Sequence, residues 1–75
     1  MYTPSEKDRI ITENRFTYHA PKDDQGVRYV LLRDEAKRLA ELFISNCPPS
    51  RELSLAITNL EQAVMWANAS IARNE

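Results

Sequence analysis

Two long segments with apolar residues three and four positions apart dominate this sequence, and only a short proline-containing corner separates them. The segments run from about Gln25 to Asn46 and from Ser50 to about Arg73, and the spacing predicts amphipathic helices rather than strands. The corner NCPPS ends the first helix, because Pro48 disfavours helical geometry at Cys47. Helices joined so closely run antiparallel, so the sequence predicts a long helical hairpin. The expected seam residues are Tyr29, Leu32, Ala36, Leu39 and Phe43, then Leu53, Ile57, Leu60, Val64, Ala67 and Ile71.

A shorter helix is expected before the hairpin. Thr3, Pro4 and Glu6 have the form of a capping box with proline in the first helical position, which predicts a helix from Pro4 to Glu13. The segment from Asn14 to Asp24 has no sustained period and reads as a connector, whose last acidic residues begin the next helix. The prediction is a single all-α domain over residues 1–75.

Further apolar residues lie off the two seams and are expected to form a second face: Val27, Val30, Leu31, Leu42, Ile44, Leu55, Met65 and Trp66. At 75 residues, one core stabilises a monomer only marginally. One cysteine and one histidine exclude an intrachain disulfide and make a poor structural zinc site. We therefore expect a homo-oligomer, with Trp66 in the core or between subunits; a ligand-stacking ring is the alternative for Trp66.

The charge balance limits the range of partners. Ten Lys and Arg against eleven Asp and Glu argue against binding of long DNA or RNA. The start, MYTPSEKDRI, lacks the basic and apolar regions of a signal peptide, and no window approaches the roughly 18 apolar residues needed to span a bilayer. The expectation is a cytoplasmic protein without a membrane partner, whose local basic clusters suit small anions.

Catalytic and metal chemistry have little support. His19 and Cys47 lie at opposite ends of the first long helix, about 30 Å apart, so they cannot form a dyad within one subunit. Cys47 is expected to be a half-buried corner residue. His19 with Asp23 and Asp24 has suitable atoms for a metal, but no recognisable ligand spacing. The prediction is a protein that is not an enzyme and that has no metal or cofactor.

The stretch RFTYHAPKDDQGVRY, which covers most of the connector and the start of the next helix, carries most of the residues that suit a ligand. Phe16 and Tyr18 alternate in an extended pattern, and basic groups surround them, including His19 and, on the next helix, Arg28 and Arg33. Rings stack on nucleobases and basic groups hold phosphates, so together they favour a nucleotide ligand. The alternative is that the two rings only fasten the first helix to the hairpin, with the arginines on a solvated face.

Nearly the full chain, most clearly from about Ile11 to Glu75, resembles the small phage proteins that act as anti-CBASS cyclic-oligonucleotide sponges, a family that shares its helical hairpin with a domain of the anti-Thoeris sponges. The segments RFTYHAPKDDQGVRY, RDEAKRLAELF and CPPSRELSLAITNLEQAVMWANASIARNE carry the resemblance. It implies a hexamer of hairpins that binds cyclic di- and trinucleotides between subunits without cleaving them, in the host cytoplasm. The implied ligands are 3',3'-cyclic GMP-AMP, other cyclic dinucleotides and cyclic tri-AMP.

The resemblance also implies roles for individual residues. Tyr18 occupies the position of a tyrosine that stacks on a base, and Arg33, fifteen positions later, that of a basic residue that holds a phosphate. A related protein carries lysine where Arg33 stands here, so charge is kept while reach and fork geometry differ. Arg73, in the basic end IARNE, is the candidate for a separate trinucleotide site on a three-fold axis. The alternative functions are an interaction protein that docks through its surplus apolar face and, less favoured, an enzyme that degrades the nucleotide.

Overall fold

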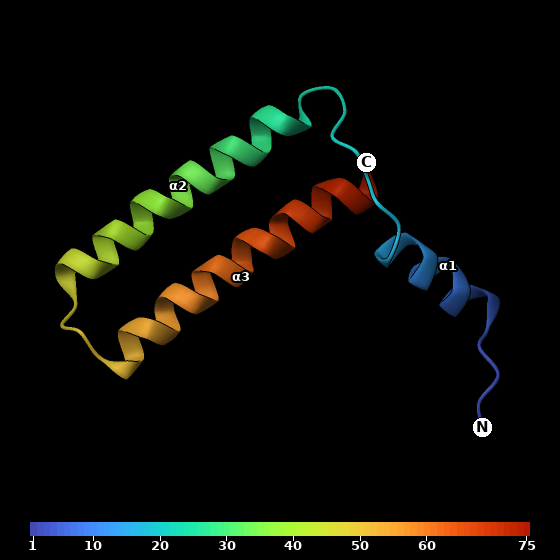
Figure 1. Cartoon of the computed structure of the whole chain (residues 1–75), viewed down its shortest axis with the longest axis horizontal. Helices are drawn as coiled ribbons and strands as arrows, with labels where there is room; N and C mark the ends of the chain where they lie inside the picture. The colour runs from blue at the N-terminus through green and yellow to red at the C-terminus, as the bar shows by residue number, and fades with distance from the viewer.

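A computed structural model describes residues 1–75 as three α-helices without a strand: α1 (Glu6–Arg15), α2 (Gln25–Asn46) and α3 (Arg51–Asn74). Helices α2 and α3 run side by side in opposite directions, and α1 projects from the open end of this hairpin (Figure 1). The chain measures 49 × 38 × 13 Å along its principal axes, so its helices form a single flat layer. The predicted all-α fold with a long hairpin is confirmed.

The start of α1 differs from the prediction. Ser5, rather than Thr3, is the N-cap, because its hydroxyl accepts a hydrogen bond from the Asp8 main-chain N–H (3.1 Å) while the Asp8 carboxylate accepts one from the Ser5 N–H (3.1 Å). These reciprocal bonds lower the pKa of Asp8, mainly through the Ser5 main-chain N–H. The predicted range Pro4–Glu13 is therefore wrong by two residues at each end, since Ser5 and Asp8 form the better capping box.

At the corner between the long helices, the backbone is as predicted from the sequence, but the exposure of Cys47 is not. Cys47 is extended and its N–H donates to the carbonyl of Phe43, which ends α2. Ser50 caps α3 by accepting a hydrogen bond from the Leu53 N–H (3.1 Å). Cys47 is exposed, so its predicted half-burial is wrong. No third element covers this end of the hairpin, as Figure 1 shows.

The subunit has no apolar core of its own. Gln25 is its only buried residue, and the seam side chains are half-buried except for Leu39, which is exposed. The accessible surface is 6443 Å², whereas a compact monomer of this mass exposes about 4,700 Å². The radius of gyration of 16.8 Å also exceeds the roughly 11 Å of a compact chain of this length. The single chain therefore leaves much more of its surface in contact with solvent than a compact monomer does.

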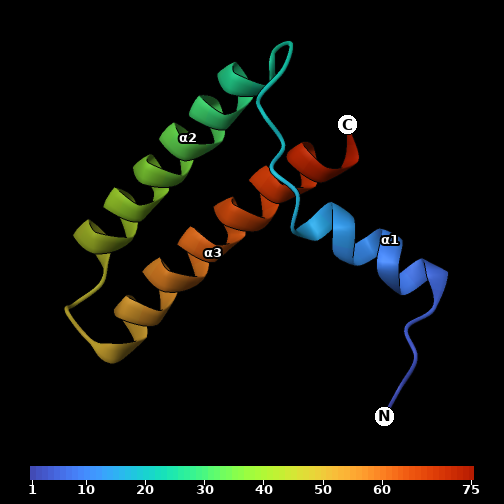
Figure 2. The ribbon, with the colours of Figure 1, turned by 45° about the vertical axis from the view of Figure 1, so that its right-hand side comes forward.

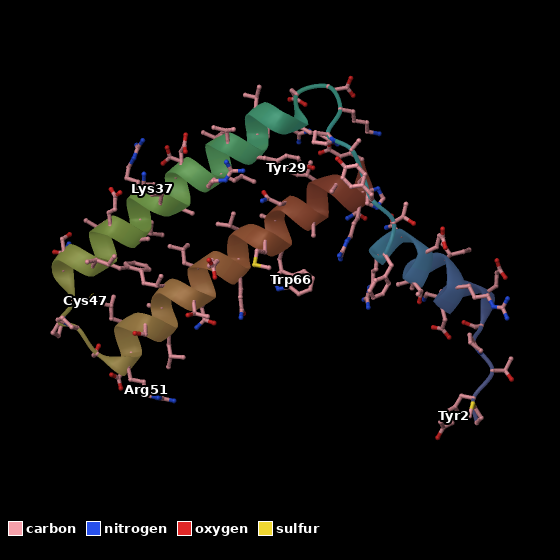
Figure 3. The ribbon with its side chains drawn as sticks, viewed as in Figure 1. Tyr2, Tyr29, Lys37, Cys47, Arg51 and Trp66 are labelled. Carbon is pink, nitrogen blue, oxygen red and sulfur yellow. The ribbon has the colours of Figure 1, made fainter.

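All eight residues that were predicted to form a second apolar face are exposed. Trp66 lies on the side of α3 that faces away from α2, whereas Tyr29 lies between the two helices (Figure 3). None of the three helices is both long enough and apolar enough to cross a lipid bilayer.

The connector from Phe16 to Asp24 passes over the C-terminal end of α3 on its way from α1 to α2 (Figure 2). Asp23 has a positive φ of 52°, which turns the chain into α2. Asp24 precedes the helix as its N-cap, but its carboxylate pairs with Arg28 (3.1 Å) instead of capping the helix. The connector thus brings residues near position 20 against the last turns of α3.

Candidate functional site

A pocket of about 410 Å³ opens to solvent at the end of the hairpin where the connector meets both long helices. Its volume is in the range of small-molecule sites. Four of the five site residues expected from the sequence line it, namely Tyr18, His19, Arg33 and Arg73. Its remaining lining residues are Arg15, Thr17, Tyr29, Asn68, Ala69 and Ala72.

The register of the hairpin explains how the two helices share this pocket. Tyr29 is as far along the chain from the end of α2 at Asn46 as Asn68 is from the start of α3 at Arg51. Because both helices rise equally per residue, these two positions lie opposite each other. Arg33 lies one turn from Tyr29 on α2 and so borders the same pocket.

Hydrogen bonds hold the connector against α3. The side-chain amide of Asn14 donates to the main-chain carbonyl of Arg73 (3.1 Å), and Nε2 of His19 lies 2.9 Å from the main-chain carbonyl of Asn14. In the tautomer with its proton on Nε2, His19 donates this bond. The end of α1 and the connector are thereby tied to the last turn of α3. Tyr18, next to His19, is 81% exposed, so its ring is open to a partner.

The pocket concentrates positive charge. Three arginines, Arg15, Arg33 and Arg73, line it, and no aspartate or glutamate does. The ion pairs within the subunit involve only Arg28 and Arg38, so none of the three is paired with a carboxylate. In a chain with a net charge of −1, this local excess is attractive to an anion. The rings of Tyr18 and Tyr29 add stacking surfaces, a combination that suits phosphates joined to bases.

Arg28 is the one predicted site residue that lies outside this pocket. Its Nη1 donates to Oε2 of Glu75 (2.7 Å), its Nη2 pairs with Oε1 of the same carboxylate, and Asp24 is a second partner. The hydrogen bonds from Arg28, and then the one from Gln25, lower the pKa of Glu75 to about 2. The same hydrogen bonds to Glu75 raise the pKa of Arg28 further. Arg28 is thus already paired within the subunit.

Asn68 is a lining residue that the sequence analysis did not single out. Its Oδ1 is buried and accepts no hydrogen bond within the subunit, which is unusual for an amide oxygen. The equal distance of Tyr29 and Asn68 from the corner could have identified it. Ala69 and Ala72 also line the pocket, where their small side chains leave space beside α3.

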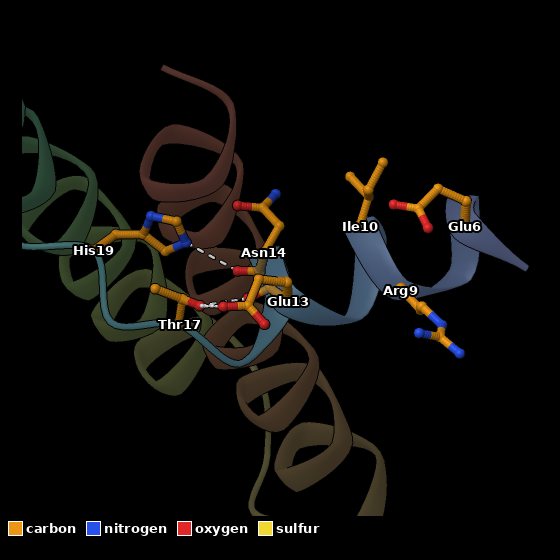
Figure 4. A pocket seen from close by; sticks show the side chains of 7 residues that line it. All are labelled: Glu6, Arg9, Ile10, Glu13, Asn14, Thr17 and His19. Carbon is orange, nitrogen blue, oxygen red and sulfur yellow. Dashed lines mark hydrogen bonds between the residues drawn. The ribbon is translucent and has the colours of Figure 1, made fainter. Parts of the chain in front are cut away.

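A larger pocket of about 540 Å³ lies along α1, but its chemistry is mixed (Figure 4). Glu6 and Glu13 contribute negative charge to it, and Arg9 is its single arginine. Thr17 donates to the main-chain carbonyl of Glu13 (2.6 Å), so part of its polar lining is used internally. Nowhere do three or more His, Cys, Asp or Glu side chains converge as metal ligands would. We therefore regard the arginine-lined pocket as the candidate site.

Comparison with known protein families gives a match over most of the chain. The family model described as the Acb2/Tad1 hairpin domain matches residues 8–72, which include most of α1, the connector, all of α2 and α3 as far as Ala72. No curated protein and no solved structure matches the chain significantly.

Proposed function

The chain belongs to the Acb2/Tad1 hairpin-domain family, and we propose that it is a phage anti-defence sponge for cyclic oligonucleotides. In this proposal it binds the messenger stoichiometrically, without cleaving it, and so keeps it from CBASS effectors. The observation that carries the proposal is the pocket in which three arginines and two tyrosines meet without a carboxylate. The site of action would be the cytoplasm of the host.

Each part of a cyclic dinucleotide has a counterpart in this pocket. Tyr18 would stack on a base, since its ring is largely exposed. Its position in the connector would be held by the hydrogen bond between the neighbouring His19 and the main-chain carbonyl of Asn14. Arg33 would hold a phosphate with its planar fork of donors. Arg15 and Arg73 would neutralise the remaining charge from either side of the pocket. The ligands proposed first are 3',3'-cyclic GMP-AMP and other cyclic dinucleotides.

The proposed sites are shared between subunits. The pocket is open in the single chain, and a cyclic dinucleotide has approximate two-fold symmetry. Two copies around a two-fold axis would each present Tyr18 and Arg33 to one ligand. The exposed apolar face and the excess surface of the subunit support an assembly, for which we propose a hexamer.

Arg73 is the proposed contact for cyclic tri-AMP. Besides the pocket with Tyr18, it lines a neighbouring pocket of about 390 Å³ with Gln62, Met65, Trp66 and Ala69. A cation between two adjacent pockets is suited to a phosphate in either, so the two kinds of ligand would compete for Arg73 if both sites lie on the same subunit.

Isothermal titration with 3',3'-cyclic GMP-AMP and with cyclic tri-AMP, followed by heating of the complex and chromatography of the released ligand, tests the function. We expect tight binding at less than one ligand per chain and recovery of intact ligand. Absence of binding to both ligands would refute the sponge. Linear product formed by catalytic amounts of protein would instead indicate a nucleotide-degrading enzyme.

A second candidate function is supported by the exposed apolar face alone. In that case the protein would dock on a host or phage protein through residues such as Trp66 and Met65. A defined partner that co-purifies from infected cells and is lost on Trp66→Ala, together with no nucleotide binding, would favour this function over the sponge.

A further inference from the structure

Glu75 forms hydrogen bonds with three side chains, one from the end of the connector and two from the first turn of α2. Arg28 binds its carboxylate with both terminal nitrogens, and the side-chain amide of Gln25 donates to Oε1 (3.2 Å). Lys22 completes the cluster, because its Nζ donates to the main-chain carbonyl of Glu75 (3.1 Å). These four residues, Lys22, Gln25, Arg28 and Glu75, are called the latch below.

The latch contains the one buried residue of the chain. This residue, Gln25, is 3% exposed. Its amide group is satisfied on both sides, since Oε1 accepts a hydrogen bond from the Lys22 main-chain N–H (3.1 Å) while Nε2 donates to Glu75. A subunit without an apolar core thus fixes one end of its hairpin with a polar cluster, whose charge-assisted bonds are the stronger kind.

The latch joins the two segments that form opposite sides of the candidate pocket. Lys22 closely follows Tyr18 and His19 in the connector, and Glu75 follows Arg73 by two residues on the α3 side. Apart from the latch, the connector is held to α3 only through the hydrogen bonds of Asn14. Preorganised groups bind with less entropy loss than groups that must be ordered by the ligand.

We propose that Glu75 is a positioning residue for nucleotide binding, which acts by closing the latch and thereby fixing the distance between Tyr18 on the connector and Arg73 on α3. The proposal rests on the proposed function. It also assigns Arg28 to the latch rather than to the ligand, since the Arg28 guanidinium is already engaged by two carboxylates, those of Glu75 and Asp24.

Replacement of the Glu75 carboxylate distinguishes these two roles of Arg28 by the direction of the effect. Glu75→Gln keeps the shape but removes the negative charge and replaces one acceptor oxygen with an NH2 donor, so Arg28 can no longer bind the side chain with both terminal nitrogens. We expect the affinity for 3',3'-cyclic GMP-AMP to fall about five- to tenfold. If Arg28 instead contacts the phosphates, the same variant frees its guanidinium and affinity rises. A rise, or an unchanged affinity, would overturn the proposal.

Two further variants separate positioning from general stability. Glu75→Asp keeps a carboxylate and should recover most of the affinity, which a loss through general instability would not explain. Glu41→Gln removes the same charge from an exposed carboxylate of α2 that has no ion pair, so binding should stay at the native level. Sedimentation of all three variants checks that the assembly keeps its native size.

A measurement without ligand keeps the latch testable if the sponge hypothesis fails. Amide hydrogen exchange of Glu75→Gln should accelerate at Gln25 and Arg28, whose N–H groups donate to Lys22 and Asp24, and stay native in the middle of α2. Native exchange rates at both residues would overturn the proposal that Glu75 holds the latch closed. A wild-type protein that binds no cyclic nucleotide refutes the proposed function, whereas the exchange data still decide whether Glu75 orders the connector.

Discussion

Replacement of Trp66 by alanine should weaken the assembly far more than it affects the single hairpin. Trp66 is 68% exposed within the subunit. A fully buried tryptophan removes up to about 250 Å² from water, so roughly 170 Å² would remain for a neighbouring subunit to cover. At about 25 cal/mol per Å², that burial stabilises the assembly by up to about 4 kcal/mol per chain. Its loss corresponds to roughly a thousandfold weaker association.

Sedimentation velocity over a wide dilution series measures this loss. The wild type should keep its native size, whereas Trp66→Ala should dissociate at much higher concentration and unfold with a midpoint that depends on concentration. Tyr2→Ala is the matched control, because Tyr2 is 97% exposed but lies in the tail before α1. If Trp66→Ala keeps both the native size and the native unfolding temperature at the lowest concentration, the assignment of this face to subunit contacts is wrong.

The remaining predictions concern the pocket and the latch. Tyr18→Ala should cost about 1–3 kcal/mol of dinucleotide binding for each ring used, measured by titration, with Tyr18→Phe close to the wild type and the assembly intact; native affinity would exclude this ring from the site. Arg33→Gln should cost about 1.5–3 kcal/mol, and Arg33→Lys less, since lysine keeps the charge without the fork; equal affinities of the two variants would contradict a bidentate contact. The pKa of Glu75 is lowered from 4.5 to about 2, mainly by Arg28, so the stability from the latch should be complete above about pH 4.5 and lost as the pH falls towards 2. Hydrogen-exchange protection at Gln25, taken relative to the intrinsic exchange rate at each pH, measures this loss, and an unprotected Gln25 amide at pH 6 would contradict it.

The sequence was sufficient for the long elements and weaker at their ends. Sustained spacing predicted α2 with the observed bounds and α3 to within one residue, because many side chains contribute to that pattern. The start of α1 depends on a single cap, and Ser5 stands only two positions after the predicted Thr3. The sequence favoured Thr3, whereas the reciprocal bonds with Asp8 select Ser5. Which of two nearby hydroxyl residues caps a helix can be decided only from the hydrogen bonds of the folded chain.

The candidate site was predictable where its residues are close together in the sequence, but not where they are far apart. The rings and charges of the connector, and the one-turn spacing of Tyr29 and Arg33, are visible along the chain. The pairing of Arg28 with Glu75 is not, because 47 positions separate these residues and no periodic pattern links them. Arg28 was therefore predicted as a ligand contact without its two carboxylate partners within the chain, Asp24 and Glu75. The position of Asn68 follows only once the register of the hairpin is applied.

The lack of an apolar core has a consequence for how this chain can change by mutation. In most domains, interior residues limit stability while surface residues are available to alter binding. Here the half-buried seams and the exposed apolar face hold most of the large apolar side chains that the chain has to bury. A substitution that adapts the surface to a new ligand or neighbour therefore acts on the same few side chains that fold the protein. Neutral variation should be concentrated at the polar positions of α1 and at the outward charged positions of α2.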